Sequence, residues 1–306
     1  MPELPDVTVY VEHLERRLRG ASVIAISIRS PNLLRTFDPP LAAATGTTVR
    51  GVQRLGKRIV CELSGDLYLV LHLMIAGRLH WRDSGAASAN PVKAGKTLIA
   101  TFTFSSGTLT LTEAGTKKRA GLWLLRGAAA LDALDPGGLE PLTASAATFG
   151  ARLAAENHTL KRALTDPRLF SGIGNAYSDE ILHRARLSPL RLTRQLDEAD
   201  VARLLAAVQA VLTEWTDRLR AETGERFPEK VTAFRKEMAV HGKWKEPCPV
   251  CGAPVQRIVY AENEVNYCPR CQTEGRLLAD RSLSRLLRED WPRTVEELEE
   301  MRGRVT

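Results

Sequence analysis

Hydrophobic positions in the first 130 residues recur in short runs that favour β-strands. Six segments are solidly apolar or alternate with a period of two residues, and turn residues separate them. These segments are SVIAISIR, KRIVCEL, DLYLVLHL, TLIATFTF, GTLTLTEAG and RAGLWLL. Because strands at such short spacing pair as hairpins, the pattern predicts a β-sandwich or barrel over residues 1 to about 130.

The segment in front of these runs, PDVTVYVEHLERRLRG, is mixed. Val7, Val9 and Val11 alternate as in a strand, whereas Val7, Leu14 and Leu18 fall on one face of a helix. Proline suits the first helical turn, and Gly20 suits the position just past the last. We therefore expect a helix at the N-terminus.

The pattern breaks on Pro and Gly at residues 134–141, LDPGGLEP, and its period afterwards is helical. We expect a domain boundary here. Residues 145–166 predict one helix and residues 197–219 a stronger one, with Asp197 as its cap. Between them, residues 169–189 predict a Gly-punctuated turn and a short helix that stops before Pro189.

Four of the five cysteines form a C-x2-C pair, sixteen intervening residues and a second C-x2-C pair. Paired thiolates at this spacing close a tetrahedron around Zn²⁺ and leave no open position, so the pattern predicts one structural zinc. An iron–sulfur or redox role is the less favoured alternative. The insert alternates around a polar middle, as in a β-hairpin. The predicted ligands are Cys248, Cys251, Cys268 and Cys271, and Cys61 is expected to be a buried small hydrophobe.

Composition is that of an ordinary globular protein, with 44% hydrophobic and 26% charged residues among 306, which argues against disorder. The sequence has no apolar span of transmembrane length and no signal-peptide pattern at its start, so we expect a cytosolic protein without a membrane partner. A net charge of +7 and a pI near 9.3 favour a polyanionic partner.

Three separated motifs then converge: PELPDV at the terminus, SGIGNAYSDEIL between two helices and MAVHGKWKEPCPVCG at the first cysteine pair. Together they resemble the formamidopyrimidine-DNA glycosylase and endonuclease VIII family of base-excision repair enzymes, in order over residues 1 to about 272. The resemblance implies a multidomain α+β fold: an N-terminal β-sandwich catalytic domain (1–133), a helix–two-turn–helix DNA-binding domain (142–225) and a β-hairpin zinc finger (235–275). A helical extension (276–306) follows.

The resemblance gives the terminus a chemical role. It implies that Met1 is removed and that Pro2 attacks the sugar C1′ of a damaged nucleotide, which leads to a Schiff base and to strand cleavage by β/δ-elimination. An α-amino group titrates nearer neutrality than a lysine and forms an iminium that accepts electrons. Glu3 is implied to be the acid/base, and Lys57 to neutralise charge at a phosphate and the sugar.

The resemblance also implies contacts with damaged DNA, duplex or single-stranded, by a monomer. Met74 or Ile75 fills the void left by a flipped base, Arg119 faces the orphaned base, and Lys117 and Lys118 meet the backbone. The remaining implied contacts are Lys161, Asn175, Tyr177 and Asn263, and Asn175 is also placed to cap the short helix.

The sequence departs from the family pattern at residues that are implied to recognise the lesion and to bind the DNA backbone. Ala120 stands where the glycosylase branch has Phe, Asn263 stands where the finger normally has Arg, and Asp6 replaces Glu. Glu262 and Glu264 flank Asn263 and would repel a phosphate. Residues 221–235 are short for the loop that caps oxidised purines. We therefore expect that abasic-site lyase chemistry is retained, while preference shifts toward oxidised pyrimidines or single-stranded lesions.

Two other classes of function compete with this reading. A damage sensor that lost catalysis would explain Asn263, and retained Met1 would favour it. It would not explain the intact Pro2, Glu3, Lys57 and Asn175. A zinc-ribbon protein of transcription or translation explains the cysteines and the charge but leaves the terminus and SGIGNAYSDE unexplained.

Overall fold

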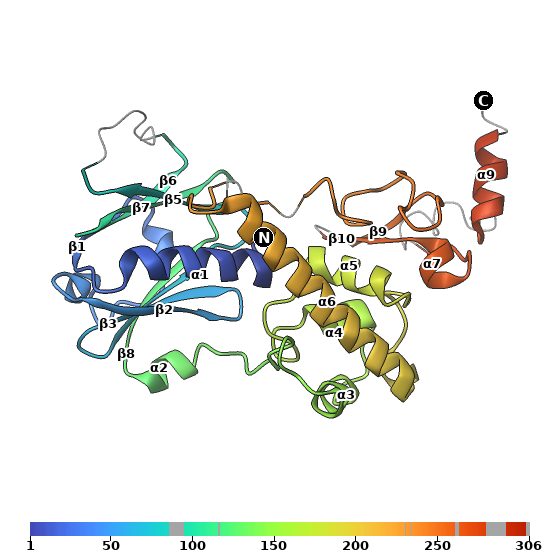
Figure 1. Cartoon of the computed structure of the whole chain (residues 1–306), viewed down its shortest axis with the longest axis horizontal. Coiled ribbons are helices and arrows are strands. Elements are labelled where there is room, and N and C mark those ends of the chain that lie inside the picture. The colour runs from blue at the N-terminus through green and yellow to red at the C-terminus, as the bar shows by residue number, and fades with distance from the viewer. Residues whose placement is uncertain are drawn as a thin grey trace. The chain divides into compact units, whose positions relative to one another are not determined.

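The computed structural model describes residues 1–85, 95–115, 117–229, 231–232, 234–260, 263–279 and 292–303. The chain divides into two compact units, drawn in Figure 1. The first comprises Met1–Pro136 with Glu214–Ala233, and the second comprises Gly137–Thr213 with Phe234–Thr306. The first division falls inside the segment 134–141, where the sequence predicts a boundary. The finer domain limits given above stay predictions.

Two four-stranded antiparallel sheets form the sandwich of the first unit. One sheet has the order β1 (Val23–Ile28), β6 (Leu98–Phe104), β7 (Gly107–Glu113) and β5 (Gly77–Asp83). The other has the order β2 (Val49–Leu55), β3 (Arg58–Leu63), β4 (Leu67–His72) and β8 (Gly121–Arg126). The predicted sandwich is thus confirmed, and all six predicted strands are present.

Strand β3 explains why some predicted strands are apolar on both faces. Ile59 and Cys61 belong to the core between the two sheets, whereas Val60 belongs to a smaller cluster that includes Leu131 of helix α2 (Ala128–Asp132). Cys61 is 2% exposed, which confirms its predicted place in the core.

Helix α1 (Leu4–Leu18) packs against β2 and β3 with its apolar face, which includes Tyr10 and Leu14. The predicted N-terminal helix is confirmed. Glu3 and Asp6 form a capping box, in which the Glu3 carboxylate accepts from the backbone of Asp6 and the Glu3 N–H donates to Asp6 Oδ2 at 3.0 Å. Two short 3₁₀ helices, η1 (Pro31–Leu33) and η2 (Leu41–Ala44), link β1 to β2.

The second unit contains α3 (Ala146–Ala154), α4 (Leu160–Thr165), α5 (Asn175–Arg184), η3 (Thr193–Gln195) and the first part of α6 (Glu198–Thr223). The prediction of one helix over 145–166 is wrong. Thr159 starts a new helix, because its side chain caps α4 by accepting from the backbone of Arg162. The predicted cap of α6 is confirmed, since Asp197 Oδ1 accepts from the backbone of Asp200 at 2.7 Å.

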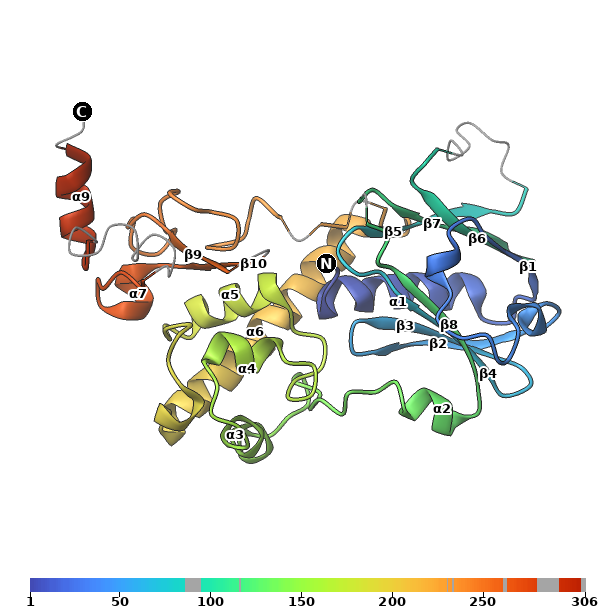
Figure 2. The ribbon, with the colours of Figure 1, turned by 180° about the vertical axis from the view of Figure 1, so that it is seen from behind.

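A two-stranded hairpin, β9 (Gln256–Tyr260) and β10 (Asn263–Tyr267), lies between the two cysteine pairs, as predicted. Helix α7 (Pro269–Thr273) follows, and α9 (Val295–Gly303) belongs to the C-terminal extension. Figure 2 shows these elements from behind. Residues 280–291, which include much of the predicted extension, lie outside the described residues. Among the helices that are described, none combines the length and the apolar character needed to cross a membrane.

Candidate active site and metal centre

The N-terminus lies in a buried, charged environment within the first unit. Pro2 is buried, and Glu3 is only 2% exposed. Burial lowers the pKa of the Met1 amino group; the Glu3 carboxylate opposes this shift, and the cations Arg78 and Lys57 add to it. The structure therefore brings the terminus within electrostatic reach of Glu3 and Lys57, the other two predicted catalytic residues.

A tight turn between β2 and β3 presents Lys57. Gly56 adopts a φ of +61° in this turn, which favours glycine, and its carbonyl accepts from Arg54 Nη1 at 2.9 Å. The sequence pattern alone gives little reason to single out a lysine between two strands.

Arg78, which sequence reasoning missed, contributes to the same region. Its guanidinium donates to the carbonyls of Ile75 at 3.1 Å and Gly77 at 2.7 Å, so it supports the loop between β4 and β5. Its only signal in the sequence is its place directly after that loop.

The same loop carries the predicted void-filling residues. Met74 has a φ of +51°, an uncommon conformation for a residue with a side chain, and its N–H donates to His72 Nδ1 at 3.1 Å. Burial, then Arg58 and Lys57, lower the pKa of His72 to about 4, which keeps Nδ1 available as an acceptor. Ile75 is 56% exposed, so its apolar side chain is presented to solvent.

The loop that carries Arg119 is held from two sides. The Glu113 carboxylate accepts from the backbone N–H groups of Arg119 at 2.9 Å and Ala120 at 3.3 Å. Arg35 Nη2 donates to the carbonyls of the same two residues at 3.2 and 3.3 Å. We call this pair the Glu113–Arg35 clamp; sequence reasoning missed it. Lys118 also donates to the Glu113 carbonyl.

Ala120 is 2% exposed and belongs to the core of the sandwich. Its methyl group points into apolar packing, so this position presents no wedge at the loop surface.

In the second unit, Asn175 does not cap the short helix, and that prediction is wrong. Gly174 is the N-cap of α5, in extended conformation, and Asn175 is the first helical residue. Its side chain instead donates from Nδ2 to the carbonyl of Glu264 on β10, at 2.9 Å. The asparagine thus joins the start of α5 to the hairpin.

A buried polar network fixes the same helix. Lys161 Nζ donates to Asp179 Oδ1 at 2.5 Å and to the Asn175 carbonyl at 2.7 Å, and its side chain is 9% exposed. His241 Nδ1 lies 2.8 Å from Asp179 Oδ2. Tyr177 is 1% exposed. The predicted DNA contacts of Lys161 and Tyr177 stay predictions.

Glu180 ties α5 to the segment before the first cysteine. Its carboxylate accepts from the backbone of Ala239, Val240 and His241 at 2.8 to 2.9 Å. Burial raises the pKa of Glu180, and these three hydrogen bonds oppose the rise.

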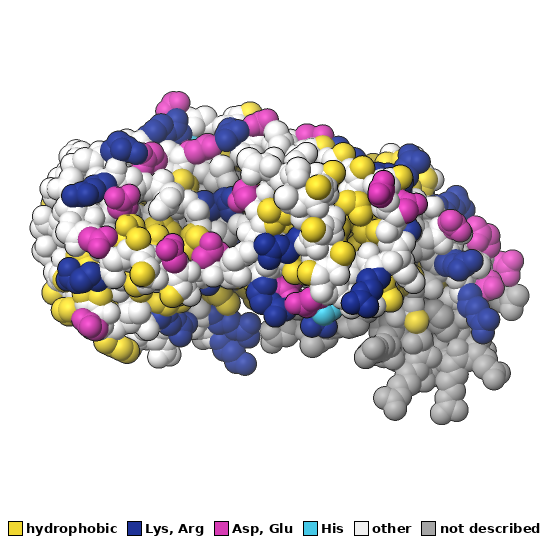
Figure 3. All heavy atoms as spheres, turned by 90° about the horizontal axis from the view of Figure 1, so that it is seen from below, with side chains coloured by type: hydrophobic (Ala, Val, Ile, Leu, Met, Phe, Trp, Pro, Cys, Tyr) yellow, Lys and Arg dark blue, Asp and Glu magenta, His cyan; other side chains and the backbone are white. Residues whose placement is uncertain are grey.

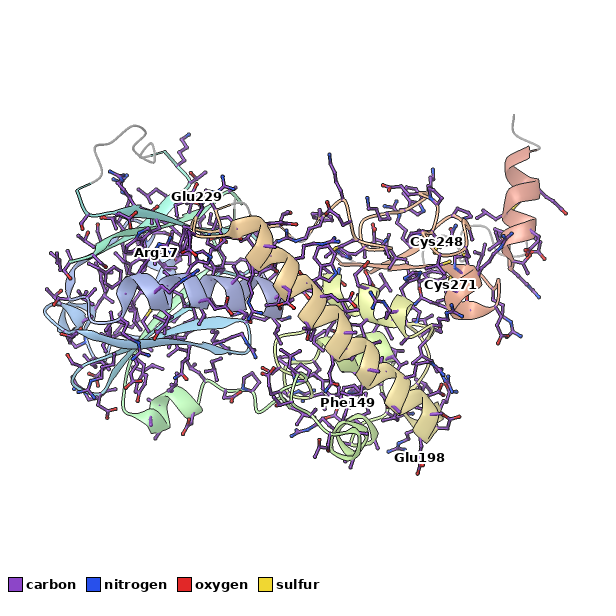
Figure 4. The ribbon with its side chains drawn as sticks, in the orientation of Figure 1. Arg17, Phe149, Glu198, Glu229, Cys248 and Cys271 are labelled. Atoms are coloured by element: carbon purple, nitrogen blue, oxygen red, sulfur yellow. The ribbon has the colours of Figure 1, made fainter. Side chains whose placement is uncertain are left out.

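The four predicted zinc ligands converge. Cys251 Sγ lies 3.3 Å from Cys268 Sγ, and Cys248 Sγ lies 3.9 Å from Cys271 Sγ; Figure 4 labels one member of each cysteine pair, Cys248 and Cys271. Tetrahedral zinc with Zn–S bonds of about 2.3 Å separates its sulfurs by roughly 3.8 Å, so the donors fit the ion. The chain has one structural zinc site.

The thiols already interact with one another. Burial raises the pKa of the Cys251 thiol, but the N–H of Ala253 and hydrogen bonds with the other three cysteines outweigh it, so the pKa is lowered. His183, on α5, lies among the same ligands: its Nε2 is 3.3 Å from Cys248 Sγ. Sequence reasoning missed this histidine.

Three family models match the chain in order. The formamidopyrimidine-DNA glycosylase N-terminal domain matches residues 1–118, the formamidopyrimidine-DNA glycosylase H2TH domain residues 138–222, and a zinc finger found in FPG and IleRS residues 245–273. A formamidopyrimidine-DNA glycosylase of Thermus thermophilus is 34% identical over 281 residues, which cover 90% of this chain and 100% of that protein. This chain belongs to the formamidopyrimidine-DNA glycosylase family.

Other family members are similarly close. A formamidopyrimidine-DNA glycosylase of Desulfitobacterium hafniense is 32% identical, over 89% of this chain and all of that one. A Lactococcus lactis Fpg solved in complex with DNA containing an abasic site superimposes with a TM-score of 0.76 at 27% identity, covering 89% of this chain and 99% of that chain. A second Lactococcus lactis complex, with DNA containing Fapy-dG, gives the same TM-score and identity.

The tip of the hairpin carries Asn263, the residue for which the resemblance leads us to expect an arginine. Asn263 pairs with Tyr260 across the two strands. Glu264 does not stand alone, because Arg257 Nη1 donates to its carboxylate at 3.1 Å. Arg257 also lies over the ring of Trp244, with 3.5 Å to the ring centroid. Glu262 lies outside the described residues.

Basic and acidic side chains share the face of the molecule that Figure 3 shows. On this face, Lys and Arg side chains are interspersed with Asp and Glu. The charge alone therefore does not mark a DNA-binding track on that face.

Proposed function

We propose that this chain excises damaged bases from DNA with Pro2 as nucleophile and Glu3 as acid/base, and then cleaves the strand at the abasic site. Because it belongs to the formamidopyrimidine-DNA glycosylase family, it is a DNA glycosylase with abasic-site lyase activity. The observation that supports the finer mechanism is the burial of Pro2 and Glu3 at the terminus, within electrostatic reach of the partly exposed Lys57 and Arg78.

The proposed steps begin with the bond between C1′ and the damaged base. The Pro2 nitrogen bonds to C1′, and the base leaves with the electron pair of its glycosidic bond and takes up a proton. Glu3 protonates the ring oxygen O4′ as the sugar opens, and loss of the amine proton leaves an iminium. Removal of a C2′ proton then expels the 3′-phosphate (β-elimination), removal of a C4′ proton expels the 5′-phosphate (δ-elimination), and water releases Pro2.

The surroundings of the terminus favour this nucleophile. Burial and the nearby cations lower the pKa of the amine that now stands at Met1. Once Met1 is removed, the same surroundings act on the secondary amine of Pro2. A lowered pKa leaves more of that amine neutral near pH 7, and only the neutral form attacks carbon.

We propose damaged DNA as the partner, contacted by both units. Met74 or Ile75 would fill the void beside the flipped nucleotide, and Arg119 and Lys118 would contact the opposite strand. In the second unit Asn175 and Asn263 are the proposed contacts. Lys161 and Tyr177, which are buried, are the other two proposed contacts of this unit. We expect a monomer in the cytoplasm, at the nucleoid, because DNA is the substrate.

The decisive experiment is a borohydride trap on DNA with an abasic site. Protein whose intact mass shows loss of Met1 should give a covalent adduct, because borohydride reduces the iminium. A matched protein with an uncleavable N-terminal extension keeps Pro2 in an amide and should give none. An adduct from the blocked protein, or none from the free protein where the Thermus relative gives one, would contradict the proposal. Retained Met1 together with no adduct would support the damage-sensor alternative.

The substrate preference is tested separately, with a panel of DNA substrates that carry different damaged bases. Ala120 buried in the core and Asn263 on the finger support a preference other than oxidised purines. We propose oxidised pyrimidines or single-stranded lesions, and expect faster excision of these than of 8-oxoguanine opposite cytosine. Faster excision of 8-oxoguanine would contradict this part alone.

A further inference from the structure

Helix α5 contacts the zinc centre near its last turn. His183 is 7% exposed, and its Nε2 lies 3.3 Å from Cys248 Sγ. Two residues past the helix's C-cap, the carbonyl of Leu187 accepts from Gln272 Nε2 at 2.9 Å, while Gln272 Oε1 accepts from the backbone of Cys268 at 2.8 Å. Both cysteine pairs are therefore linked to one helical segment by side chains that are not themselves predicted zinc ligands.

The negative charge of the zinc centre explains why a hydrogen-bond donor such as His183 is needed beside it. Zn²⁺ with four thiolates carries a net charge of −2, and a buried charge of that size needs hydrogen-bond donors. Cys248 is 2% exposed, so bulk water is excluded as the main donor to its sulfur. The imidazole of His183 is at hydrogen-bonding distance from that sulfur.

His183 lies close to three of the predicted ligands: its ring nitrogen and the sulfurs of Cys248, Cys268 and Cys271 all lie within 4.8 Å of one another. The four cysteines already supply a complete set of ligands: Cys248 Sγ lies 3.9 Å from Cys271 Sγ, and Cys251 Sγ lies 3.3 Å from Cys268 Sγ. A fifth donor in the same shell would exceed the four-coordinate geometry of structural zinc.

We propose that His183 is a positioning residue of the zinc centre whose Nε2–H donates a hydrogen bond to the Cys248 thiolate. The bond disperses negative charge from the sulfur and joins the zinc centre to the helix that begins with Asn175. It slows loss of the metal and holds the finger against α5.

The first test measures zinc release from the full chain to an excess of a chromophoric chelator. His183→Phe keeps an aromatic ring and removes the donor, and His183→Gln restores an N–H near the position of Nε2. Loss of an outer hydrogen bond to a zinc ligand typically costs about 10- to 100-fold in metal affinity, so we expect release at least ~10-fold faster from His183→Phe and slower release from His183→Gln than from His183→Phe. His158→Phe is the matched control, because His158 pairs with Glu156. Equal release from His183→Phe and wild type would overturn the proposal.

Cobalt substitution separates a donor from a ligand. In the proposed arrangement, Co²⁺ keeps the d–d spectrum of four thiolates in wild type and in His183→Phe, and the sulfur-to-cobalt charge-transfer band moves to longer wavelength in the variant. The proposal would be overturned if cobalt-substituted wild type showed the d–d spectrum of three sulfurs and one nitrogen and this spectrum changed in His183→Phe. That result would make His183 a ligand.

A measurement on the unaltered protein guards against a variant that fails to fold. In zinc-loaded, ¹⁵N-labelled wild type, Nε2 of His183 should have the chemical shift of a protonated ring nitrogen. With ¹¹³Cd in place of zinc, its proton should show scalar coupling to the metal through Cys248 Sγ. A Nε2 shift typical of an unprotonated or a metal-bound nitrogen would refute the proposed bond.

Discussion

The two units of this molecule are stabilised in different ways. The first has a continuous apolar core between two sheets, and its candidate catalytic groups lie at the chain terminus and in loops. The second buries an ion pair between side chains: Asp179 is fully buried, and its partners Lys161 and His241 have side chains less than a tenth exposed. It also contains the zinc site.

The difference shows how chemistry and stability are divided. In the first unit the candidate catalytic groups are not part of the apolar core, although Glu3 is buried and caps α1. In the second unit the groups that hold the helix and the finger together are polar. Removing one partner there leaves an uncompensated buried charge, which is strongly destabilising.

The largest expected effect is on chemistry in the first unit. Glu3→Gln keeps the size of the side chain but removes its acid/base function, which contributes typically about 10²- to 10⁴-fold in rate. We expect base excision to fall by that order, with zinc content unchanged. Glu12→Gln, on the same helix, is the matched control, because Glu12 pairs with Arg220 at the surface. Equal excision rates in both variants would mean that Glu3 only caps the helix.

The next effect is on stability in the second unit. Lys161→Met leaves the Asp179 carboxylate buried without its cation, which should lower the free energy of unfolding by about 3–5 kcal/mol. Urea unfolding followed by a probe in this unit measures it. Arg168→Met removes an ion pair with Asp166 whose arginine is 60% exposed, and should cost less than about 1 kcal/mol. Similar losses in both variants would contradict the contrast drawn between the two units.

A smaller effect is expected at the Glu113–Arg35 clamp. Glu113→Gln replaces a charged acceptor that holds the Arg119 loop by a neutral one, and hydrogen bonds to charged groups contribute about 1.5–3 kcal/mol. We expect excision to discriminate less among the four bases opposite the lesion. Borohydride trapping on a single-stranded abasic site, where there is no opposite base, should be unchanged. Lost trapping would instead point to a damaged fold.

Sequence patterns predicted most of the first unit because its core follows period-two apolar runs. The two strands that they missed, β2 and β5, are both edge strands. Edge strands carry more polar residues, which interrupt the period-two apolar pattern. The prediction of one helix over 145–166 was wrong because Thr159 caps the start of α4. The sequence pattern around this threonine does not distinguish a cap from a position inside a helix.

Pairings between distant residues account for the rest. The cysteine spacing carries its own geometry, so the zinc ligands could be predicted. Asn175 looked like a cap, but its partner lies on β10, far along the chain. His183, Arg35 and Glu113 owe their roles to contacts across 65 to 85 residues or within a loop, and no local pattern reports these.

The smallest expected effect concerns pH and the first unit. Burial, then the neighbouring cations Arg16 and Arg17, lower the pKa of His13 to about 4, and the ring lies 6.2 Å from that of Phe227. His13 and Arg17 both lie on α1, and Figure 4 labels Arg17. Because the unfolded chain binds a proton at His13 near pH 6.5 and the folded chain does not, the contribution is fully present above pH 6.5 and is lost as pH falls toward 4.

His13→Gln should therefore flatten the acid limb of the stability curve. We expect the free energy of unfolding of the wild type to drop by about 1–2 kcal/mol more than that of the variant between pH 7 and pH 4. Urea unfolding at several pH values, followed by a probe in the first unit, measures the difference. His158→Gln, in the second unit, should leave this curve unchanged. If the two variants shift it equally, the acid sensitivity belongs to the whole chain and not to the contact between α1 and Phe227.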